Sequence, residues 1–356
     1  MIQGERMDAV LLPTLAALLA SASPVVMAND ATFGGRGTDL LPLVETRVRM
    51  VSEDILLELI PVQDAWQVTA RYQFQNPTQQ VVSLQLGFPE EACPDDRDCT
   101  PQAGQFRDMV TTVRGAEVTH REGKVKAEDG WGGQLGQVYL YDLTFQPGET
   151  VEVVHSYRYD RSSGIDWWGT RYLTRTGNLW NGPIDSATFT VRMPQPVRYV
   201  IYPREFQLKR YAESPRPDGQ GSVTELVFYA APYAPQVDFS VTFPGPSLVA
   251  STPEGLCPGI DGETAPDELD PPLSAWSGPL LRACRNQIYG LHGYPFKDPE
   301  LRRQHYTPEP LPDWADKAVF TIADRPENPG FAPTWLSPGE RALIDAIVAE
   351  EQRRKR

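Results

Sequence analysis

A long series of alternating segments between Thr46 and Phe243 constrains the fold more than any other feature of the chain. Apolar and polar residues alternate within each segment, as in WQVTARYQFQ (66–75) and TVEVVHSYRY (150–159), and β-branched and aromatic side chains are frequent. A period of two residues is typical of strands with one buried face. Turn-forming stretches such as PDGQG (217–221) separate the segments. The pattern predicts an antiparallel β-sandwich, either one elaborate sandwich or two joined ones.

The composition changes after Phe243. Residues 244–272 are rich in proline and contain six acidic residues but no Lys or Arg, which predicts a semi-rigid, self-repelling linker. From residue 273 onward, apolar residues recur at the three- and four-residue spacing of a helix: Leu280, Leu281, Cys284, Ile288 and Leu291. We therefore expect an α+β protein in which a β-sandwich region (29–243) and a linker (244–272) precede a small α-helical module (273–356).

Two further helix starts are expected in this module. Asp298-Pro299-Glu300 combines an N-cap residue, a proline at the first helical position and an acid in the first turn, and predicts a short helix toward Tyr306. Ser337-Pro338-Gly339-Glu340 has the spacing of a capping box and predicts a C-terminal helix.

The N-terminus is typical of a secretory signal peptide. An apolar run extends from Leu11 to Ala28, and Val26 and Ala28 occupy the small-residue positions before a cleavage site. Residues 1–28 are thus predicted to be removed, so that Asn29 becomes the first residue. No later segment has the roughly 20 apolar residues of a membrane span. The sequence predicts export to the periplasm or the extracellular space, with no membrane span after signal removal.

The chain contains four cysteines, all of which follow Ala28. An even number in an oxidising compartment predicts two disulfides, for which three pairings exist. Cys93–Cys99 and Cys257–Cys284 are the pairings that we favour. A zinc site is the competing interpretation, but the sequence has no C-x-x-C and no His near any of the four, so no metal is expected.

The formal net charge of −14 restricts the partners of the chain. Phosphate backbones and anionic lipid surfaces repel an acidic protein, so nucleic acid is not expected as a partner. No phosphate-binding loop or dinucleotide fingerprint occurs, and we expect no cofactor.

The stretch RNQIYGLHGYPF (285–296) resembles the signature of the YARHG domain, and the resemblance extends over about residues 275–352. It implies an extracytoplasmic accessory module of bacterial proteins that occurs beside varied partner domains. Gly290 and Leu291 stand where the family has Ala and Arg, and Leu343 stands where Asn is frequent, so a role that depends on that Arg is not expected here. The signature positions are Arg285, Asn286, Ile288, Tyr289, His292, Gly293, Tyr294 and Phe296.

The N-terminal region is similar to an uncharacterised family of exported bacterial β-rich proteins. The similarity lies in MVSEDILLEL (50–59), ARYQFQNPTQQVV (70–82), GFPEE (87–91) and YLTRTGNLWNGPID (172–185). It implies no known activity.

His292 is the first candidate for chemistry, because the chain has only four His. We interpret it as structural: Gly293 is suited to the left-handed residue after a helix end, Tyr294 can fold back on Ile288 or Tyr289, and His292 can bond a free carbonyl of the last turn. A catalytic His needs a nucleophile or acid within hydrogen-bond reach, and the local sequence offers none.

An aromatic stretch, GIDWWGTRYLTRTGNLW (164–180), is the second candidate. We expect it to form a loop, which either covers one end of the sandwich or recognises a partner by stacking on a sugar ring or anchoring a protein. The candidate binding residues are Trp167, Trp168, Tyr172 and Trp180.

No catalytic motif was found among those of hydrolases and metallopeptidases, and we assign no catalytic residue. The sequence predicts an exported protein of the bacterial envelope, more consistent with a non-enzymatic binding or interaction protein than with an enzyme. Its partner would be an envelope protein or a glycan. The alternative is a hydrolase that acts on envelope polysaccharide through paired carboxylates, because acidic residues are plentiful.

Overall fold

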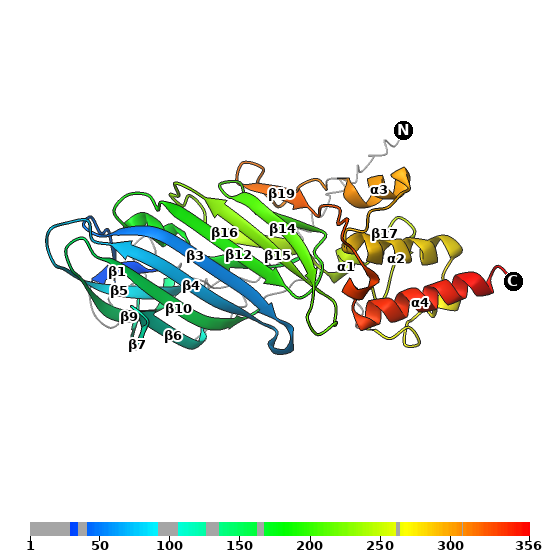
Figure 1. Cartoon of the computed structure of the whole chain (residues 1–356), viewed down its shortest axis with the longest axis horizontal. Coiled ribbons are helices and arrows are strands. Elements are labelled where there is room, and N and C mark those ends of the chain that lie inside the picture. Colours follow the sequence, from blue (N-terminus) through cyan, green and yellow to red (C-terminus); the bar gives the residue numbers. More distant parts are fainter. Residues whose placement is uncertain are drawn as a thin grey trace, which may run out of the picture.

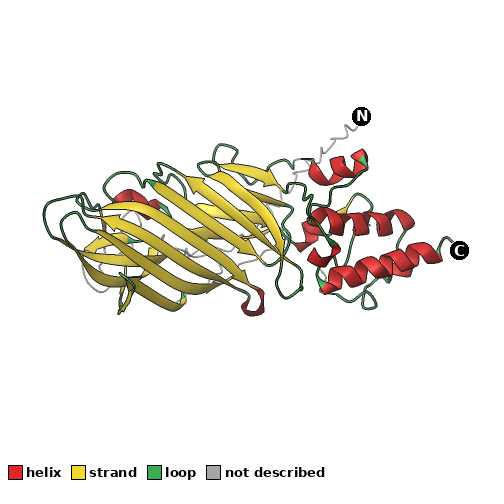
Figure 2. Ribbon diagram, viewed as in Figure 1, coloured by secondary structure: helices red, strands yellow, loops and turns green. Residues whose placement is uncertain are grey.

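The computed structural model describes residues 29–34, 41–91, 106–125, 135–161, 167–260, 264–307 and 309–356. Strands fill one end of the elongated molecule and helices gather at the other (Figure 2). The α+β prediction is therefore confirmed. The predicted signal peptide and the Cys93–Cys99 pair lie outside the described residues. Among the helices that are described, none is both long and apolar enough to cross a membrane.

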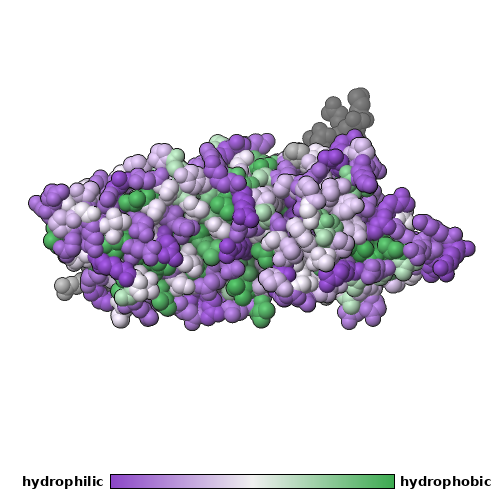
Figure 3. Space-filling view, in the orientation of Figure 1, coloured by the Kyte–Doolittle hydropathy of each residue, from purple (hydrophilic) through white to green (hydrophobic). Residues whose placement is uncertain are grey.

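An eight-stranded sheet spans the whole β-rich region (Figure 1). Its strands, in spatial order, are β14 (Gln207–Pro215), β15 (Ser222–Ala230), β12 (Ser186–Met193), β3 (Arg49–Ile60), β4 (Ala65–Gln75), β10 (Thr150–Asp160), β6 (Arg107–Val113) and β7 (Ala116–Val118). The alternation seen in the sequence places one side of each long strand in the core. The opposite face is open to solvent and mostly hydrophilic, with scattered hydrophobic side chains (Figure 3).

Two smaller sheets cover different halves of the large sheet. One contains, in order, β2 (Leu41–Leu43), β1 (Ala31–Gly34), β5 (Val82–Glu91), β9 (Leu135–Phe145) and β8 (Arg121–Lys124). The other contains β11 (Trp167–Tyr172), β16 (Phe239–Pro244), β13 (Tyr199–Pro203) and β19 (Phe320–Asp324).

Aromatic contacts show how the layers pack. The Phe88 ring of β5 lies 5.4 Å from the Tyr157 ring of β10, and the Phe239 ring of β16 lies 4.2 Å from the Phe189 ring of β12. Both small sheets thus pack on the same face of the large sheet, and one hydrophobic core runs beneath them. Of the two predicted arrangements, the structure has two sandwiches joined through a shared sheet.

One pairing departs from the antiparallel prediction. β12 lies parallel to β3, with Phe189 opposite Ile55, whereas the other described strand pairs are antiparallel. Alternation of side chains is the same in both directions, so the sequence pattern does not report strand direction.

The predicted linker is folded, and this corrects our expectation for residues 244–272. It contains α1 (Pro246–Val249) and a hairpin of β17 (Ser251–Thr252) and β18 (Gly255–Leu256). Cys257, Ile260 and Leu269 are buried in the core of the C-terminal module. A few apolar residues among many acids were enough to anchor the segment, because burial of each side chain stabilises its position by roughly 1.5–3 kcal/mol.

The C-terminal module is built on α2 (Gly278–Leu291), α3 (Pro299–Tyr306) and α4 (Pro338–Arg353). Both predicted helix starts are confirmed: Asp298 caps α3, and Ser337 and Glu340 form the capping box of α4. The predicted disulfide Cys257–Cys284 is present and joins the former linker to α2. Four short 3-10 turns occur in the described chain, at Pro61–Gln63, Arg175–Leu179, Leu273–Ala275 and Pro333–Trp335.

The boundary between the two regions is crossed by a strand. β19 comes from the C-terminal part of the chain, yet it pairs antiparallel with β13, with Ile322 opposite Ile201. The sequence had predicted a separate helical module for residues 273–356. The structure corrects this, because the segment also completes a sheet of the sandwich region.

Candidate functional site

Four buried charged side chains lie where the helices meet the sheet, and we call this cluster the seam. Glu213 extends from β14, His292 from the end of α2, Arg325 follows β19, and Glu340 lies in the first turn of α4. Each side chain is at most 5% exposed. Burial of four ionisable groups has a large desolvation cost unless they are paired, so their mutual geometry decides the character of the site.

The end of α2 fixes the position of His292. Gly293 is left-handed with φ of 71°, the Tyr294 N–H donates to the Tyr289 carbonyl at 3.0 Å, and the Gly293 N–H donates to the Gly290 carbonyl at 3.0 Å. The Tyr289 and Tyr294 rings lie 5.3 Å apart. These are the bonds and the apolar contact of a Schellman ending, and the predicted helix end is confirmed.

The partners of His292 differ from the prediction. Its side chain bonds two carboxylates rather than a helix carbonyl: Nδ1 lies 2.6 Å from Oε1 of Glu213, and Nε2 lies 2.9 Å from Oε1 of Glu340. Ionised carboxylates only accept hydrogen bonds, so this geometry fits an imidazolium that donates from both nitrogens. The partners are 79 and 48 residues away in sequence, which explains why the local sequence gave no sign of them.

Arg325 balances the charge of the seam. It forms an ion pair with Oε2 of Glu213, so two carboxylates face two cationic groups. Burial lowers the pKa of Arg325 to about 10, despite an opposing contribution from Tyr211. Its Nε is buried and has no hydrogen-bond partner among the described residues. A buried donor without a partner is costly, and such an atom points to a missing acceptor.

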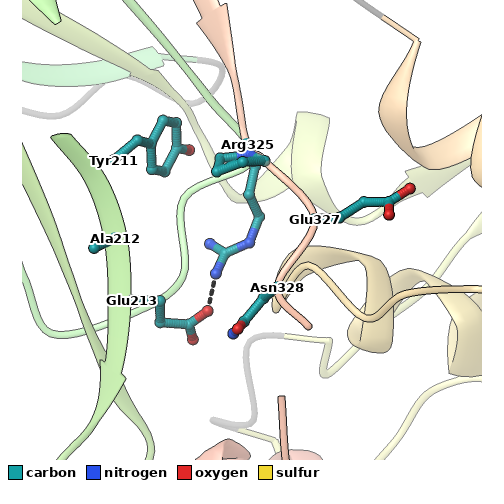
Figure 4. Close-up of a pocket in the computed structure, with 7 residues that line it drawn as sticks. Tyr211, Ala212, Glu213, Arg325, Glu327 and Asn328 are labelled. Carbon is teal, nitrogen blue, oxygen red and sulfur yellow. Dashed lines mark ion pairs between the residues drawn. The ribbon is translucent and has the colours of Figure 1, made fainter. Parts of the chain in front are cut away.

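A pocket of about 210 Å³ opens beside this guanidinium group (Figure 4). One wall is the β14 strand and the other is the segment after β19, so both regions of the molecule contribute to it. The lining residues are Tyr211, Ala212, Glu213, Arg325, Pro326, Glu327 and Asn328. We refer to it as the seam pocket.

The helix end supports one wall of the seam pocket. The Asn328 N–H donates to the Gly293 carbonyl at 2.6 Å. A Cβ added to Gly293 would lie 2.9 Å from Cβ of Asn328 and 2.9 Å from the Pro326 carbonyl oxygen, so glycine is required for this close approach as well as for the positive φ. His292 and Gly293 of the resembled signature therefore hold the pocket in shape.

The other signature residues belong to the core of the C-terminal module. Ile288 and Phe296 are buried, Asn286 is nearly so, and Arg285 forms an ion pair with Glu351 of α4. Tyr289 and Tyr294 surround Phe331. These contacts agree with the structural interpretation of the signature.

The described part of the aromatic stretch, residues 167–180, is not a surface loop, and this expectation is corrected. Residues 167–172 form β11, where Trp168 and Tyr172 point into the core; Trp180 is also buried. Only Trp167 is partly exposed, and its ring lies 5.4 Å from that of Trp314, which is 47% exposed. The two-residue spacing of Trp168, Thr170 and Tyr172 is a strand signal that the neighbouring glycines obscured.

A hydrogen-bonded chain crosses the sandwich core. Asp30 Oδ2 lies 2.9 Å from Nε2 of His155, and His155 Nδ1 lies 2.7 Å from Oγ1 of Thr111, which in turn contacts Nε2 of His120 at 2.6 Å. The order acid, His and hydroxyl is that of a hydrolase triad. However, Asp30, His155 and Thr111 are fully buried, so no substrate can reach the hydroxyl and the chain is structural. His155 lies on β10, between β4 and β6 in the large sheet.

Within the described ranges, no group of three or more His, Cys, Asp or Glu side chains has a geometry that could hold a metal ion.

Comparison with known proteins gives structural likenesses only. No family model and no curated protein matches the chain. A candidate nutrient-binding protein from Legionella pneumophila shares 20% identity with a TM-score of 0.48, over 90% of this chain and 100% of that one. An M1 zinc metallopeptidase from Deinococcus radiodurans shares 15% identity with a TM-score of 0.31, over 57% of this chain and 43% of that one.

A two-domain M1 zinc metallopeptidase variant with bound L-tryptophan shares 13% identity with a TM-score of 0.30, over 57% of this chain and 44% of that one. All three TM-scores are below 0.5, so the site has to be argued from its own geometry.

Proposed function

We propose that this chain is an exported, non-enzymatic binding protein of the bacterial envelope that holds a small polar ligand in the seam pocket. The observation that carries the proposal is the buried Nε of Arg325, which has no partner among the described side chains and main-chain atoms and lies at the wall of a pocket that both regions build. A concave site with a few convergent polar groups and a residue of perturbed pKa is a typical small-molecule site.

The pocket walls define the chemistry of the ligand. Arg325 offers a charged donor and therefore requires an acceptor, for which a carboxylate is the best match. Glu327 and Asn328 at the same pocket offer acceptors, which suit an ammonium or hydroxyl group. A volume of 210 Å³ corresponds to about seven water molecules at 30 Å³ each. A zwitterion of about the size of an amino acid satisfies these conditions.

Membership of the YARHG family and export are parts of this proposal. The family resemblance is supported by the compact arrangement of Tyr289, His292 and Gly293 at one helix end. Export is supported by the Cys257–Cys284 disulfide, since such bonds persist mainly in oxidising compartments. In this proposal the module contributes half of the binding site rather than acting as an independent accessory domain.

The hydrolase alternative is less well supported at this pocket. A glycosidase needs one carboxyl group that carries a proton to the leaving group and a second free carboxylate. Glu213 is already bonded to Arg325 and His292, and Oε1 of Glu327 lies 2.6 Å from Nη2 of Arg302. Carboxylates with cationic partners are better suited to orient a ligand than to donate protons.

A second candidate function is recognition of a macromolecule by Trp314 and Trp167. The exposed Trp314 ring meets the Trp167 ring at an interplanar angle of 77°, and Trp167 also lies 6.1 Å from Tyr199. An exposed aromatic side chain supported by others can stack on a sugar or anchor a protein. This retains, for Trp167 alone, the role that the sequence predicted for the aromatic stretch.

A thermal-shift screen tests the pocket proposal. The wild-type chain, Glu327→Gln and the control Glu152→Gln would be heated with a panel of amino-acid-sized zwitterions and matched neutral solutes. Glu152 is also an Arg-paired surface Glu, on β10 and outside the pocket lining. We expect at least one zwitterion to raise the melting temperature of wild type and control, with about tenfold weaker binding to Glu327→Gln, a loss of about 1.4 kcal/mol. No stabilising solute, or equal binding to all three chains, would contradict the proposal.

The second candidate is tested by affinity capture from envelope extract. Trp314→Ala would be compared with Leu256→Ala, which removes an exposed apolar side chain from the β17–β18 hairpin. A partner lost only with Trp314→Ala supports macromolecular recognition. A partner that both variants retain contradicts it.

A further inference from the structure

The first two described residues are already inside the core. Asn29 and Asp30 are fully buried, and the main-chain carbonyls of both accept bonds from the sandwich: Thr176 Oγ1 donates to Asn29 at 3.0 Å, and Trp180 Nε1 donates to Asp30 at 3.0 Å. The Asn29 side-chain amide donates to Oε2 of Glu53 at 2.9 Å. Asn29 therefore has a defined and enclosed position in the fold.

Two carboxylates are buried at this position with little positive charge around them. Asp30 accepts from the Tyr141 hydroxyl at 2.7 Å and meets His155, whereas the one donor to Glu53 among the described residues is the neutral Asn29 amide. Among ion pairs of the described residues, His155 reaches Asp30 and none reaches Glu53. Burial, and to a smaller extent the charge of Glu53, raises the pKa of Tyr72, Tyr172 and Tyr233, so these hydroxyls bring no positive charge to Glu53.

Three buried side-chain oxygens have no hydrogen-bond partner within the described part of the chain: Asn29 Oδ1, Asp30 Oδ1 and Glu53 Oε1. Native proteins rarely leave so many acceptors unsatisfied at one point. A cationic donor close to Asn29 would satisfy them and would offset the charge of Glu53. Removal of the predicted signal peptide generates such a donor.

We infer that proteolytic processing between Ala28 and Asn29 creates a buried α-ammonium group on Asn29 that forms the missing ion pair with Glu53. The cleavage consumes one water molecule: the peptide bond breaks, Ala28 leaves with a new carboxylate, and Asn29 retains the amine, which takes up a proton. An endopeptidase of the envelope is the required catalyst. The α-nitrogen is four covalent bonds from Nδ2, thus at most about 5 Å from the atom that already bonds Glu53.

Processing should change how the free energy of unfolding depends on pH. Before cleavage the buried Glu53 has no cation beside it among the residues that the structure describes, and burial raises its pKa to about 8 from an ordinary value of 4.5, although the Asn29 amide opposes the shift. A raised pKa means that stability is complete below pH 4.5 and falls as the pH rises through 8. After cleavage the ammonium group compensates the charge of ionised Glu53. This loss of stability with rising pH should then be absent up to the pH at which the amine itself loses its proton.

Two chains that differ only at the N-terminus provide the test. One begins at Asn29 and the other retains the native residues Val26, Met27 and Ala28, which displace the ammonium by up to about 10 Å. Each is prepared as wild type, as Glu53→Gln and with the control substitution Asp54→Asn, which changes an exposed acid on the same strand. Intact mass of protein recovered from the envelope or the medium of cells expressing the full chain establishes the natural start.

We expect the recovered protein to begin at Asn29. At pH 7.5 the extension should lower the melting temperature by roughly 5 °C in wild type and in Asp54→Asn, and by much less in Glu53→Gln. As the pH rises from 4.5 to 8, the wild-type extended chain should lose stability relative to the wild-type chain that begins at Asn29, because titrations common to both chains cancel in the difference. If Glu53→Gln does not fold, the two wild-type pH profiles decide alone.

A different natural start, or equal pH profiles for the two wild-type chains, would overturn the inference. An extension effect of the same size in Glu53→Gln would also overturn it, because it would show a steric cause.

Discussion

The sandwich region and the C-terminal module stabilise themselves by different means. The sandwich has a large continuous core in which whole strand faces are apolar, and it contains no disulfide among the described residues. The module has a small core of twelve buried residues and adds a disulfide, three capped helix starts and the charged seam. Small cores bury too little apolar surface to be stable alone, so specific cross-links and ion pairs matter far more in the module.

The two regions also place their buried polar groups differently. In the sandwich, the chain from Asp30 through His155 to Thr111 is enclosed on all sides. At the seam, Glu213 and Arg325 are equally buried but border an open pocket. Both regions contain a buried His that is paired with an acid. A candidate site differs from a structural network because a ligand can reach it from solvent. The predictions below test this contrast, beginning with the largest effect.

Substitution His292→Ala should have the largest effect on stability. It leaves Glu213 and Glu340 facing each other at the seam without their shared cation, and breaking a buried pair in this way costs about 3–5 kcal/mol. Urea unfolding of the full chain measures the loss. In a double-mutant cycle, Glu213→Gln should make the His292→Ala substitution markedly less costly; a loss below about 1 kcal/mol for His292→Ala alone would contradict the ionic account.

Removal of the disulfide should destabilise the module selectively. Cys257 and Cys284 are separated by 27 residues, and a loop of that length corresponds to about 3.5 kcal/mol in the chain-entropy relation. In the chain with both residues changed to Ser, hydrogen exchange should accelerate in α2 and α4 but not in β3 and β4. Equal acceleration in both regions would remove the distinction between them.

Substitution Thr111→Val should cost about 1–3 kcal/mol, because it removes the hydroxyl partner of the buried His155 Nδ1 and of Nε2 of the partly buried His120. The matched control is Thr112→Val, since the neighbouring side chain lies on the other face of β6 and is only partly buried. Thermal unfolding of the two variants provides the comparison. If both variants lose the same stability, the hydrogen-bonded chain through Thr111 contributes nothing beyond an ordinary strand residue.

The acid response of the module should depend weakly on His305. Burial, and secondarily Arg198, lowers the pKa of His305 from 6.5 to about 4. A depressed pKa means that its contribution is complete above pH 6.5 and is lost as the pH falls through 4. His305→Gln should therefore flatten the fall in melting temperature between these pH values. An unchanged slope would assign the acid response to other groups.

The sequence was sufficient for features that depend on local pattern. Alternation located the long strands, the Asp298 and Ser337 caps located two helices, and the glycine after His292 predicted the Schellman ending. Each of these is determined by residues a few positions apart. The sequence could not show that one sheet serves two sandwiches or that β12 lies parallel to β3, because side-chain alternation contains no information about partner or direction.

The residues of the candidate site are far apart in the sequence, so the sequence alone could not show that they meet. His292 was recognised as unusual, but Glu213 and Arg325 become neighbours only when β19 joins β13. The aromatic stretch was predicted as a loop, although residues 167–172 form β11 with Gly169 inside the strand. In the structure a Cβ at Gly169 would lie 2.1 Å from the Val241 carbonyl oxygen, so glycine permits close approach of β16 to β11.

Calorimetric unfolding of the full chain tests most directly the central claim that the seam joins both regions into one body and thereby builds the pocket. We predict a single transition for the wild type, with equal calorimetric and van't Hoff enthalpies. The variant that combines Glu213→Gln with His292→Ala should show two transitions, the first assigned to the helical module. Two separate transitions in the wild type, with the first unchanged in the variant, would contradict the claim.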